Sequence, residues 1–271
     1  MPELPEVETT LRGIEPHICN QTLDKIVVRN ASLRWPVPVE QLQALTGLSV
    51  NKVERIAKYI LIHTELGVIL LHLGMSGSLR VLDADLAAEK HDHIDLVFSN
   101  NKLVRLNDPR RFGCCLLLTE PISAHKLLAS LGPEPLGDEF TGDRLYKLSR
   151  GRSVSIKNFI MDNKVVVGVG NIYASESLFM AGIRPTMAIK RISRARYDVL
   201  ASAIRAVLSK AITAGGTTLN DFTQADGKPG YFAQELQVYG REGLACNQCG
   251  EVIKSKVIGQ RNTFYCTVCQ K

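Results

Sequence analysis

The chain has 271 residues, of which 45% are hydrophobic and 22% are charged, which is the composition of a folded globular protein rather than a disordered one. Its apolar runs are much shorter than the about 18 residues that a membrane-spanning helix needs. Its first residues have neither the basic start nor the apolar centre of a secretory signal. We therefore expect a soluble, cytoplasmic protein that is long enough for two domains.

The net charge is +6, and the basic residues gather in the second half of the chain. Three stretches, 144–157, 184–196 and 241–271, each hold five Lys or Arg, against no acidic residue in the first two and two in the third. Basic stretches are often solvated helix faces, but several of them repel one another unless a polyanion binds. Their placement favours nucleic acid as the partner.

The first predicted element is an amphipathic helix. The apolar residues that recur at helical spacing are Leu4, Val7, Leu11, Ile14 and Ile18. Proline suits the first turn of a helix, where its missing N–H has no partner, and carboxylates suit the positive end of the helix dipole. The start of the chain, MPELPEVETT, therefore fits a helix N-terminus.

Short β-rich runs follow between residues 22 and 118, separated by Gly, Asn, Asp and Pro. This texture predicts an antiparallel sandwich or barrel. The stretch 131–137, LGPEPLG, contains two prolines and two glycines and predicts a domain boundary. Beyond it the pattern is helical, and residues 193–212 form the clearest long helix.

The last thirty residues contain the strongest local signal. The cysteines form two C-x2-C pairs separated by sixteen residues, namely Cys246, Cys249, Cys266 and Cys269. This spacing suits tetrahedral zinc, and four sulfur ligands leave no open position, so the ion is expected to be structural. Two disulfides are disfavoured in a chain without an export signal, and a redox pair needs no duplication. The residues between the pairs predict two strands around a basic tip. The other cysteines lie in apolar contexts and are expected in the core.

Three weaker motifs also suggest contacts with DNA. Residues 165–177 place a glycine-rich turn before a helix that starts at Asn171, which can hold a phosphate; a dinucleotide site is rejected because its third glycine would fall at Tyr173. His91 and His93 lack a third metal ligand, which favours a surface or phosphate role. The stretch 107–113, NDPRRFG, is either an ordinary loop or an Arg and Phe wedge for a base stack.

Together these stretches resemble a known family. In chain order they are MPELPEVET, AKYILI, HLGMSGSL, DPRRFG, LGPEPL, MDNKVVVGVGNIYASESLF, GGTTLNDF, DGKPGYF and VYGREG, followed by the four cysteines. The sequence resembles formamidopyrimidine-DNA glycosylase, a bacterial base-excision family, over essentially its whole length.

The resemblance implies an α+β fold in three domains. These are an N-terminal β-sandwich with an opening helix (1–132), a helix–two-turn–helix DNA-binding domain (133–243) and a zinc-finger hairpin (244–271). It implies a monomeric glycosylase and AP lyase that removes oxidised purines, 8-oxoguanine and formamidopyrimidines, from double-stranded DNA. Strand cleavage by β,δ-elimination would follow.

The resemblance assigns five catalytic residues. Pro2 is the nucleophile, and Glu3 is the acid and base. Glu6 is a supporting carboxylate, Lys58 assists β-elimination, and Arg261 holds phosphates and serves δ-elimination. Chemistry supports the first assignment, because an α-amino group titrates near about 8, against about 10.4 for lysine. Once Met1 is removed, Pro2 would therefore supply an unprotonated amine for attack on a sugar C1′.

Further positions match DNA contacts of the family. These are His91, Arg110, Arg152, Lys157 and Asn171, of which Lys157 and Asn171 match the backbone clamp. Met75, Arg110 and Phe112 match the trio that fills the gap left by a flipped nucleotide, and residues 217–232 match a cap over the lesion base. Arg152 and Asn220 depart from the pattern, because lysine is commoner at the first position and a basic residue at the second.

Two other functions are weighed against this one. Endonuclease VIII, which removes oxidised pyrimidines, typically has glycine at position 4, where this chain has Leu4. A catalytically silent damage binder would be expected to lose Pro2, Glu3 or Lys58, and all three are present. The sequence thus favours the purine enzyme.

Overall fold

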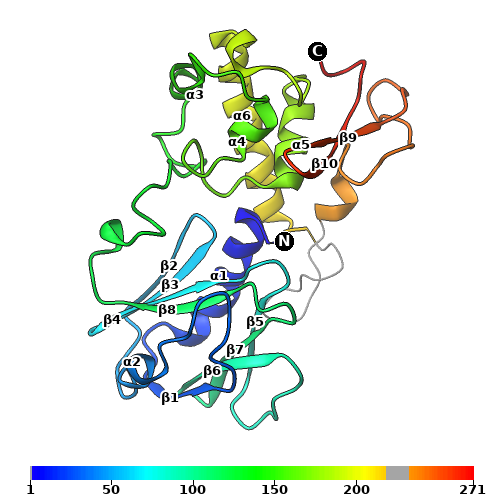
Figure 1. The fold of residues 1–271 in the computed structure, drawn as a ribbon. Coiled ribbons are helices and arrows are strands. Elements are labelled where there is room, and N and C mark those ends of the chain that lie inside the picture. The colour runs from blue at the N-terminus through cyan, green and yellow to red at the C-terminus, as the bar shows by residue number, and fades with distance from the viewer. Residues whose placement is uncertain (1, 218–231) are drawn as a thin grey trace. The chain divides into compact units, whose positions relative to one another are not determined.

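The computed structural model of the chain describes residues 2–217 and 232–271. These residues form two compact units, one of residues 2–129 and 214–217 and the other of residues 130–213 and 232–271. Figure 1 shows β-sheets in the first unit and mainly helices, with a small hairpin, in the second. The predicted α+β class is confirmed.

The first unit opens with helix α1 (Leu4–Ile18), as its apolar spacing predicts. The predicted apolar residues, Leu4, Val7, Leu11, Ile14 and Ile18, are all buried. Pro5 lies in the first turn, where no intrahelical N–H is lost. The first turn is closed by a side chain, since the N–H of Glu3 donates to Glu6 Oε2 at 2.8 Å.

Two four-stranded antiparallel sheets complete the first unit. The first sheet has the order β1 (Leu23–Val28), β6 (Asp92–Phe98), β7 (Lys102–Asn107), β5 (Ser78–Asp83). The second has the order β2 (Lys52–Ile56), β3 (Tyr59–Thr64), β4 (Gly67–His72), β8 (Cys114–Leu118). Short helices α2 (Val39–Gln43) and η1 (Ile122–Ala124) lie between and after the strands. Buried residues of α1 and of both sheets share one core, so the unit is a sandwich.

A buried ion network fixes the loop that precedes β6. Arg105 on β7 is only 2% exposed, and its guanidinium binds both carboxylate oxygens of Asp95 at 2.8 and 2.9 Å. The same guanidinium donates to the carbonyls of Leu86 and Ala87, each at 2.9 Å. Burial raises the pKa of Asp95, but Arg105 and Arg29 outweigh it and hold that pKa below its usual value. The loop is therefore held from inside the sandwich.

The second unit is built mainly of helices. These are α3 (Gly142–Ser149), α4 (Ile156–Ile160), α5 (Asn171–Met180), α6 (Arg194–Thr213) and the short η2 (Ile189–Arg191) and η3 (Phe232–Glu235). The predicted long helix is confirmed as α6. Two helices have side-chain caps, because Thr141 Oγ1 accepts from the N–H of Arg144 at 3.2 Å and Ser155 Oγ from the N–H of Asn158 at 3.4 Å.

A β-hairpin ends the chain. Strands β9 (Lys254–Ile258) and β10 (Arg261–Tyr265) pair in antiparallel fashion around Gly259 and Gln260. Both turn residues have positive φ, +56° and +62°, as a two-residue type I′ turn requires. The hairpin region packs on α5, since Cys246 and Cys266 share a buried cluster with Phe179. Among the described helices of both units, none is long and apolar enough to cross a membrane.

Candidate active site and nucleic-acid interface

The start of α1 gathers the predicted catalytic carboxylates. Pro2 is buried, and Glu3 and Glu6 are each 2% exposed. Glu6 binds two backbone N–H groups at once, because Oε2 accepts from Glu3 and Oε1 accepts from Thr217, each at 2.8 Å. Charge-assisted hydrogen bonds of this kind are strong. Glu6 thus joins the residue beside Pro2 to a segment more than 200 residues away.

Lys58 lies in the turn between β2 and β3 and is half-buried. A neighbouring ion pair attaches this turn to α1, since Arg55 Nε donates to Glu8 Oε2 at 2.8 Å and Arg55 Nη1 to the carbonyl of Ala57 at 2.9 Å. Burial raises the pKa of Glu8, but Arg55 and Arg12 outweigh it and lower that pKa below its usual value. The ion pair therefore fixes the turn that contains Lys58 against the helix that begins after Glu3.

His72, at the end of β4, is a neutral ring among cations. Its pKa is lowered to about 4, chiefly by burial and then by the charges of Lys58 and Arg34, with Asp108 acting in the opposite direction. Its Nδ1 accepts from the N–H of Gly74 at 3.0 Å, which fixes the tautomer with the proton on Nε2. His72 therefore organises the loop after β4 without carrying a charge at neutral pH.

Asp108 joins the two loops that carry the predicted wedge. Its carboxylate, in a side chain that is 0% exposed, accepts from Ser76 Oγ at 3.0 Å and from the N–H of Gly113 at 2.7 Å. The loops also touch directly, because a Cβ at Gly74 would lie 2.4 Å from the carbonyl carbon of Phe112. One buried carboxylate thus sets the spacing of both loops.

The predicted wedge residues project from these loops. Met75 is 37% exposed and Phe112 is 42% exposed, although both are large apolar side chains. The guanidinium carbon of Arg110 lies 4.7 Å from the centre of the Phe112 ring, a cation–π contact. A cavity of about 570 Å³ opens beside them, and its lining residues are Arg34, His72, Gly74, Met75, Arg111 and Phe112. The structure therefore brings Met75, Arg110 and Phe112 together in the first unit.

His91 precedes β6 in a left-handed backbone conformation, with φ +72°. Its carbonyl accepts from the N–H of Asp108 at 3.1 Å. The loop before it is the one held by Arg105. His91 and His93 have ring centres 6.4 Å apart, and His93 hydrogen-bonds the carbonyl of Asp108 at 2.8 Å. His91 is therefore hydrogen-bonded to Asp108, the residue that also holds the loops of Met75 and Phe112.

In the second unit, Asn171 is the first residue of α5, after Gly170. Its Nδ2 donates to the carbonyl of Asn262 at 3.0 Å, which joins α5 to β10. Arg261, the first residue of β10, is exposed. Lys157 on α4 is 0% exposed, whereas the basic stretch 144–157 predicts a surface residue. The structure brings Lys157, Asn171 and the residues around Arg261 together.

Two further predictions concern Arg152 and the cap over the lesion base. Arg152 is exposed in the turn after α3, next to Gly151, whose φ is +75°. The predicted cap, 217–232, lies almost wholly outside the described residues; of it, Thr217 and Phe232 are described and both are buried. The role of each stays a prediction.

The four cysteines of the last thirty residues form one cluster, and their Sγ atoms all lie within 4.8 Å of one another. Tetrahedral zinc with Zn–S bonds of about 2.3 Å places sulfurs about 3.8 Å apart. The observed separations of 3.9 Å between Cys246 and Cys269 and 3.5 Å between Cys249 and Cys266 fit this geometry. Both are far longer than a disulfide bond. The cluster fits one zinc ion in a closed, structural site.

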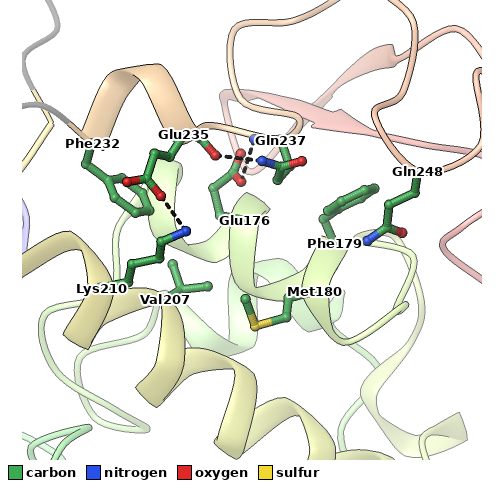
Figure 2. A pocket seen from close by; sticks show the side chains of 9 residues that line it. All are labelled: Glu176, Phe179, Met180, Val207, Lys210, Phe232, Glu235, Gln237 and Gln248. Atoms are coloured by element: carbon green, nitrogen blue, oxygen red, sulfur yellow. Dashed lines mark hydrogen bonds and ion pairs between the residues drawn. The ribbon is translucent and has the colours of Figure 1, made fainter. Parts of the chain in front are cut away.

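Glu176 is one of the residues that line a separate cavity of about 290 Å³ in the second unit (Figure 2). The Glu176 carboxylate, 4% exposed, accepts from the N–H groups of Gln237, Val238 and Tyr239 at 2.8 to 3.0 Å. Burial raises the pKa of Glu176 in spite of these three donors. The carboxylate anchors the chain that leads into the cysteine cluster.

Several organising residues are not singled out by the sequence. Asp108 precedes a proline in a turn, a position that favours Asp for local reasons, and this was the available signal. Arg55 and Arg105 offer no such signal, because the carboxylates that they bind, Glu8 and Asp95, lie on another helix or strand. Their roles depend on the packed structure.

Three family models match the chain. They are described as the formamidopyrimidine-DNA glycosylase N-terminal domain, over residues 1–115, its H2TH domain, over 131–223, and a zinc finger found in FPG and IleRS, over 243–271. Two curated relatives are formamidopyrimidine-DNA glycosylases, from Alcanivorax borkumensis at 59% identity and from Stutzerimonas stutzeri at 57%. Each alignment spans 271 residues and the full length of both chains.

The chain belongs to the formamidopyrimidine-DNA glycosylase family. Among solved structures, a Lactococcus lactis FPG variant in complex with Fapy-dG containing DNA is similar at a TM-score of 0.92, with 31% identity and full coverage of both chains. The zinc-finger match and the cysteine geometry together confirm the predicted zinc site. The division into 1–132, 133–243 and 244–271 stays a prediction.

Proposed function

We propose that this family member is a bifunctional DNA glycosylase and AP lyase that excises 8-oxoguanine and formamidopyrimidines from double-stranded DNA. The observation that carries the proposal is the family match across all three regions, in a chain with Pro2 directly before the buried Glu3 and Glu6. The Lactococcus lactis protein, whose DNA contains Fapy-dG, supports the substrate class. The resident metal would be one structural zinc.

The covalent step belongs to Pro2. After removal of Met1, its secondary amine attacks C1′ of the damaged nucleotide, and the glycosidic bond breaks. The base leaves with the electron pair of that bond and gains a proton. The Pro2 nitrogen loses its proton and Glu3 protonates the ring oxygen as the sugar opens, which leaves a positively charged imine (an iminium) between Pro2 and C1′. Glu6 holds this turn through its bond from the N–H of Glu3.

Strand cleavage follows from the imine. Loss of a proton from C2′ expels the 3′ phosphate oxygen with its electron pair, and a second elimination expels the 5′ phosphate oxygen. Lys58 assists the first elimination, and Arg261 binds phosphate and serves the second. Exposure of Arg261 at the start of β10 suits a phosphate contact.

The reaction requires extrusion of the damaged nucleotide, because C1′ is shielded inside the duplex. Unstacking costs a few kcal/mol, which apolar side chains inserted into the stack partly offset. Met75 and Phe112 are exposed apolar residues on adjoining loops, and Arg110 lies against Phe112. We assign these three residues to the gap and His91, Arg152 and Asn171 to the phosphates.

The proposed partner is double-stranded DNA that carries oxidised bases, and the proposed working form is a monomer. A substrate of this kind places the protein in the bacterial cytoplasm, with the chromosome. The basic stretches supply the phosphate contacts expected of such a protein.

The test is excision from duplexes that carry either 8-oxoguanine or an oxidised pyrimidine, with borohydride added during turnover. We expect faster release of 8-oxoguanine and a covalent protein–DNA adduct, because borohydride reduces the imine. A matched control carries extra residues ahead of Pro2, which removes the free amine while the rest of the chain is unchanged. It should form no adduct.

Two outcomes would contradict the proposal. An active enzyme that gives no adduct would exclude the imine. Preference for the oxidised pyrimidine would assign the chain to endonuclease VIII-like activity instead.

A further inference from the structure

The side chain of Lys157 is enclosed in the second unit. It projects from α4 and is 0% exposed, among the largest fully buried side chains of the described residues. A fully buried lysine is rare in proteins unless hydrogen-bonding partners surround it. Its position within a basic stretch of the sequence therefore does not make it part of a basic surface.

The Nζ group of Lys157 points to three uncharged oxygens. It donates to Asn171 Oδ1 at the start of α5, to Thr263 Oγ1 on β10 at 2.5 Å, and lies 3.5 Å from the carbonyl of Asn262. An ammonium can only donate hydrogen bonds, and all three of these oxygens can accept them. Lys157 thus joins three elements: α4, α5 and the zinc-finger hairpin.

The contacts continue to the backbone of Arg261. The hydroxyl of Thr263, itself 0% exposed, accepts from Lys157 and donates to the carbonyl of Arg261 at 3.1 Å. On the other side, Asn171 donates to the carbonyl of Asn262 at 3.0 Å. These carbonyls belong to the two consecutive peptide bonds that join Arg261, Asn262 and Thr263, so Lys157 fixes the start of the strand that presents Arg261.

The hairpin turn is also tightly placed against α4. A Cβ at Gly259 would lie 2.4 Å from Asn158 Oδ1, so the turn approaches the helix closely. Because Lys157 and Asn158 are neighbours on α4, the turn and the start of β10 both lie against the same helix. The exposed Arg261 therefore follows a turn that packs closely on α4.

We propose that Lys157 is a positioning residue that ties β10 to α4 and α5, and thereby sets Arg261 and Asn171, rather than a residue that binds a DNA phosphate itself. This rests on the proposed function for the roles of Arg261 and Asn171. A buried ammonium that already faces three acceptors contributes by fixing geometry, and a displacement of about 1 Å at a positioned group can cost about 100-fold in rate.

The test compares Lys157→Met, which keeps the length and burial of the side chain, with the control Lys126→Met, at an exposed lysine outside the basic stretches. The readouts are the ratio of δ- to β-elimination product and the salt dependence of DNA affinity. We expect Lys157→Met to lower the ratio by about 10- to 100-fold, and Lys126→Met to leave it unchanged. Borohydride trapping should still give an adduct with Lys157→Met.

The direct-contact alternative is separated in an Arg261→Ala, Asn171→Ala background. There, Lys157→Met should change neither the affinity nor its slope against salt, because the groups that it positions are already gone. If Lys157 binds a phosphate itself, Lys157→Met should instead lower the affinity and reduce the slope by about 0.9 in that background too. That result would overturn the proposal.

Thr263→Val provides a second variant in case Lys157→Met does not fold. Thr263 has no exposed surface with which to contact DNA, so a lower δ-to-β ratio in Thr263→Val would support the relay to Arg261. An unchanged ratio in a folded, zinc-containing Thr263→Val protein would overturn it. If the wild-type protein gives no adduct, the proposed function fails instead, which distinguishes the two.

Discussion

Ser76 Oγ donates to the carboxylate of Asp108 at a distance of 3.0 Å, and this bond joins two loops separated by 32 residues in sequence. Met75 lies beside the first residue, and Arg110 and Phe112 follow the second. The same carboxylate also accepts from the N–H of Gly113. One buried group therefore fixes the two loops that carry the exposed side chains of Met75 and Phe112. Base extrusion should depend on this group although its side chain has no exposed surface.

Replacement of Asp108 by alanine should therefore weaken both stability and excision. Alanine accepts from neither Ser76 nor Gly113, so the buried N–H of Gly113 loses its partner at a cost of about 1–3 kcal/mol. Denaturant unfolding measures this loss, and single-turnover release of 8-oxoguanine measures the effect on excision. The exposed Asp138→Ala is the control. Equal behaviour of the two variants would refute this role of Asp108.

Gly74→Ala tests the close approach of the two loops. At φ +65° any side chain is strained by about 1–2 kcal/mol, and here the added Cβ also meets the backbone of Phe112 at 2.4 Å. Gly47 is a matched control, since its φ is +88° but a Cβ there meets nothing within 4 Å. We expect Gly47→Ala to lose only stability and Gly74→Ala to lose excision as well. Unimpaired excision by Gly74→Ala would show that the loops can move apart.

The sequence predicts those features that depend on local spacing. The apolar residues of α1 repeat at helical period, and the cysteine pairs stand at zinc spacing. Both features can therefore be predicted without knowledge of the fold, and the structure confirms both. Lys157 shows the limit, because its basic neighbours predict a surface position, whereas the packing of α4, α5 and β10 encloses it. Asp108 and Arg105 likewise acquire their roles from strands and loops that meet only in the folded chain.

Glu6→Gln should lower both the stability of the protein and the rate of the covalent step, although the Glu6 side chain is buried. The carboxylate accepts from the N–H groups of Glu3 and Thr217 with one oxygen each, and an amide can offer an oxygen to only one of them. We expect a loss of about 1–3 kcal/mol in the free energy of unfolding and a lower rate of imine formation. Glu15→Gln on the same helix is the control. Calorimetry and borohydride trapping measure the two effects, and normal trapping would argue against a positioning role.

Zinc removal should unfold the hairpin and abolish δ-elimination before it abolishes the first covalent step. The four thiolates hold the two ends of the hairpin that presents Arg261, and binding of a structural zinc is coupled to folding. A chelator should release one zinc per chain, and the product should shift from δ- to β-elimination. Cys249→Ser should behave likewise, whereas Cys19→Ser should retain its zinc. Purified, fully active protein without zinc would exclude this coupling.

His72 should make stability fall in mildly acid solution. Its pKa is about 4 in the folded protein against 6.5 ordinarily, because burial, Lys58 and Arg34 disfavour the charged ring while Asp108 partly opposes them. The folded state therefore binds a proton less readily than the unfolded state. The contribution is fully present above pH 6.5 and is lost as the pH falls towards 4, up to about 3 kcal/mol. His72→Asn can still accept from the N–H of Gly74 but does not titrate. Its free energy of unfolding should change less than that of the wild type between pH 7.5 and pH 4.5, and parallel curves would show that His72 does not set this dependence.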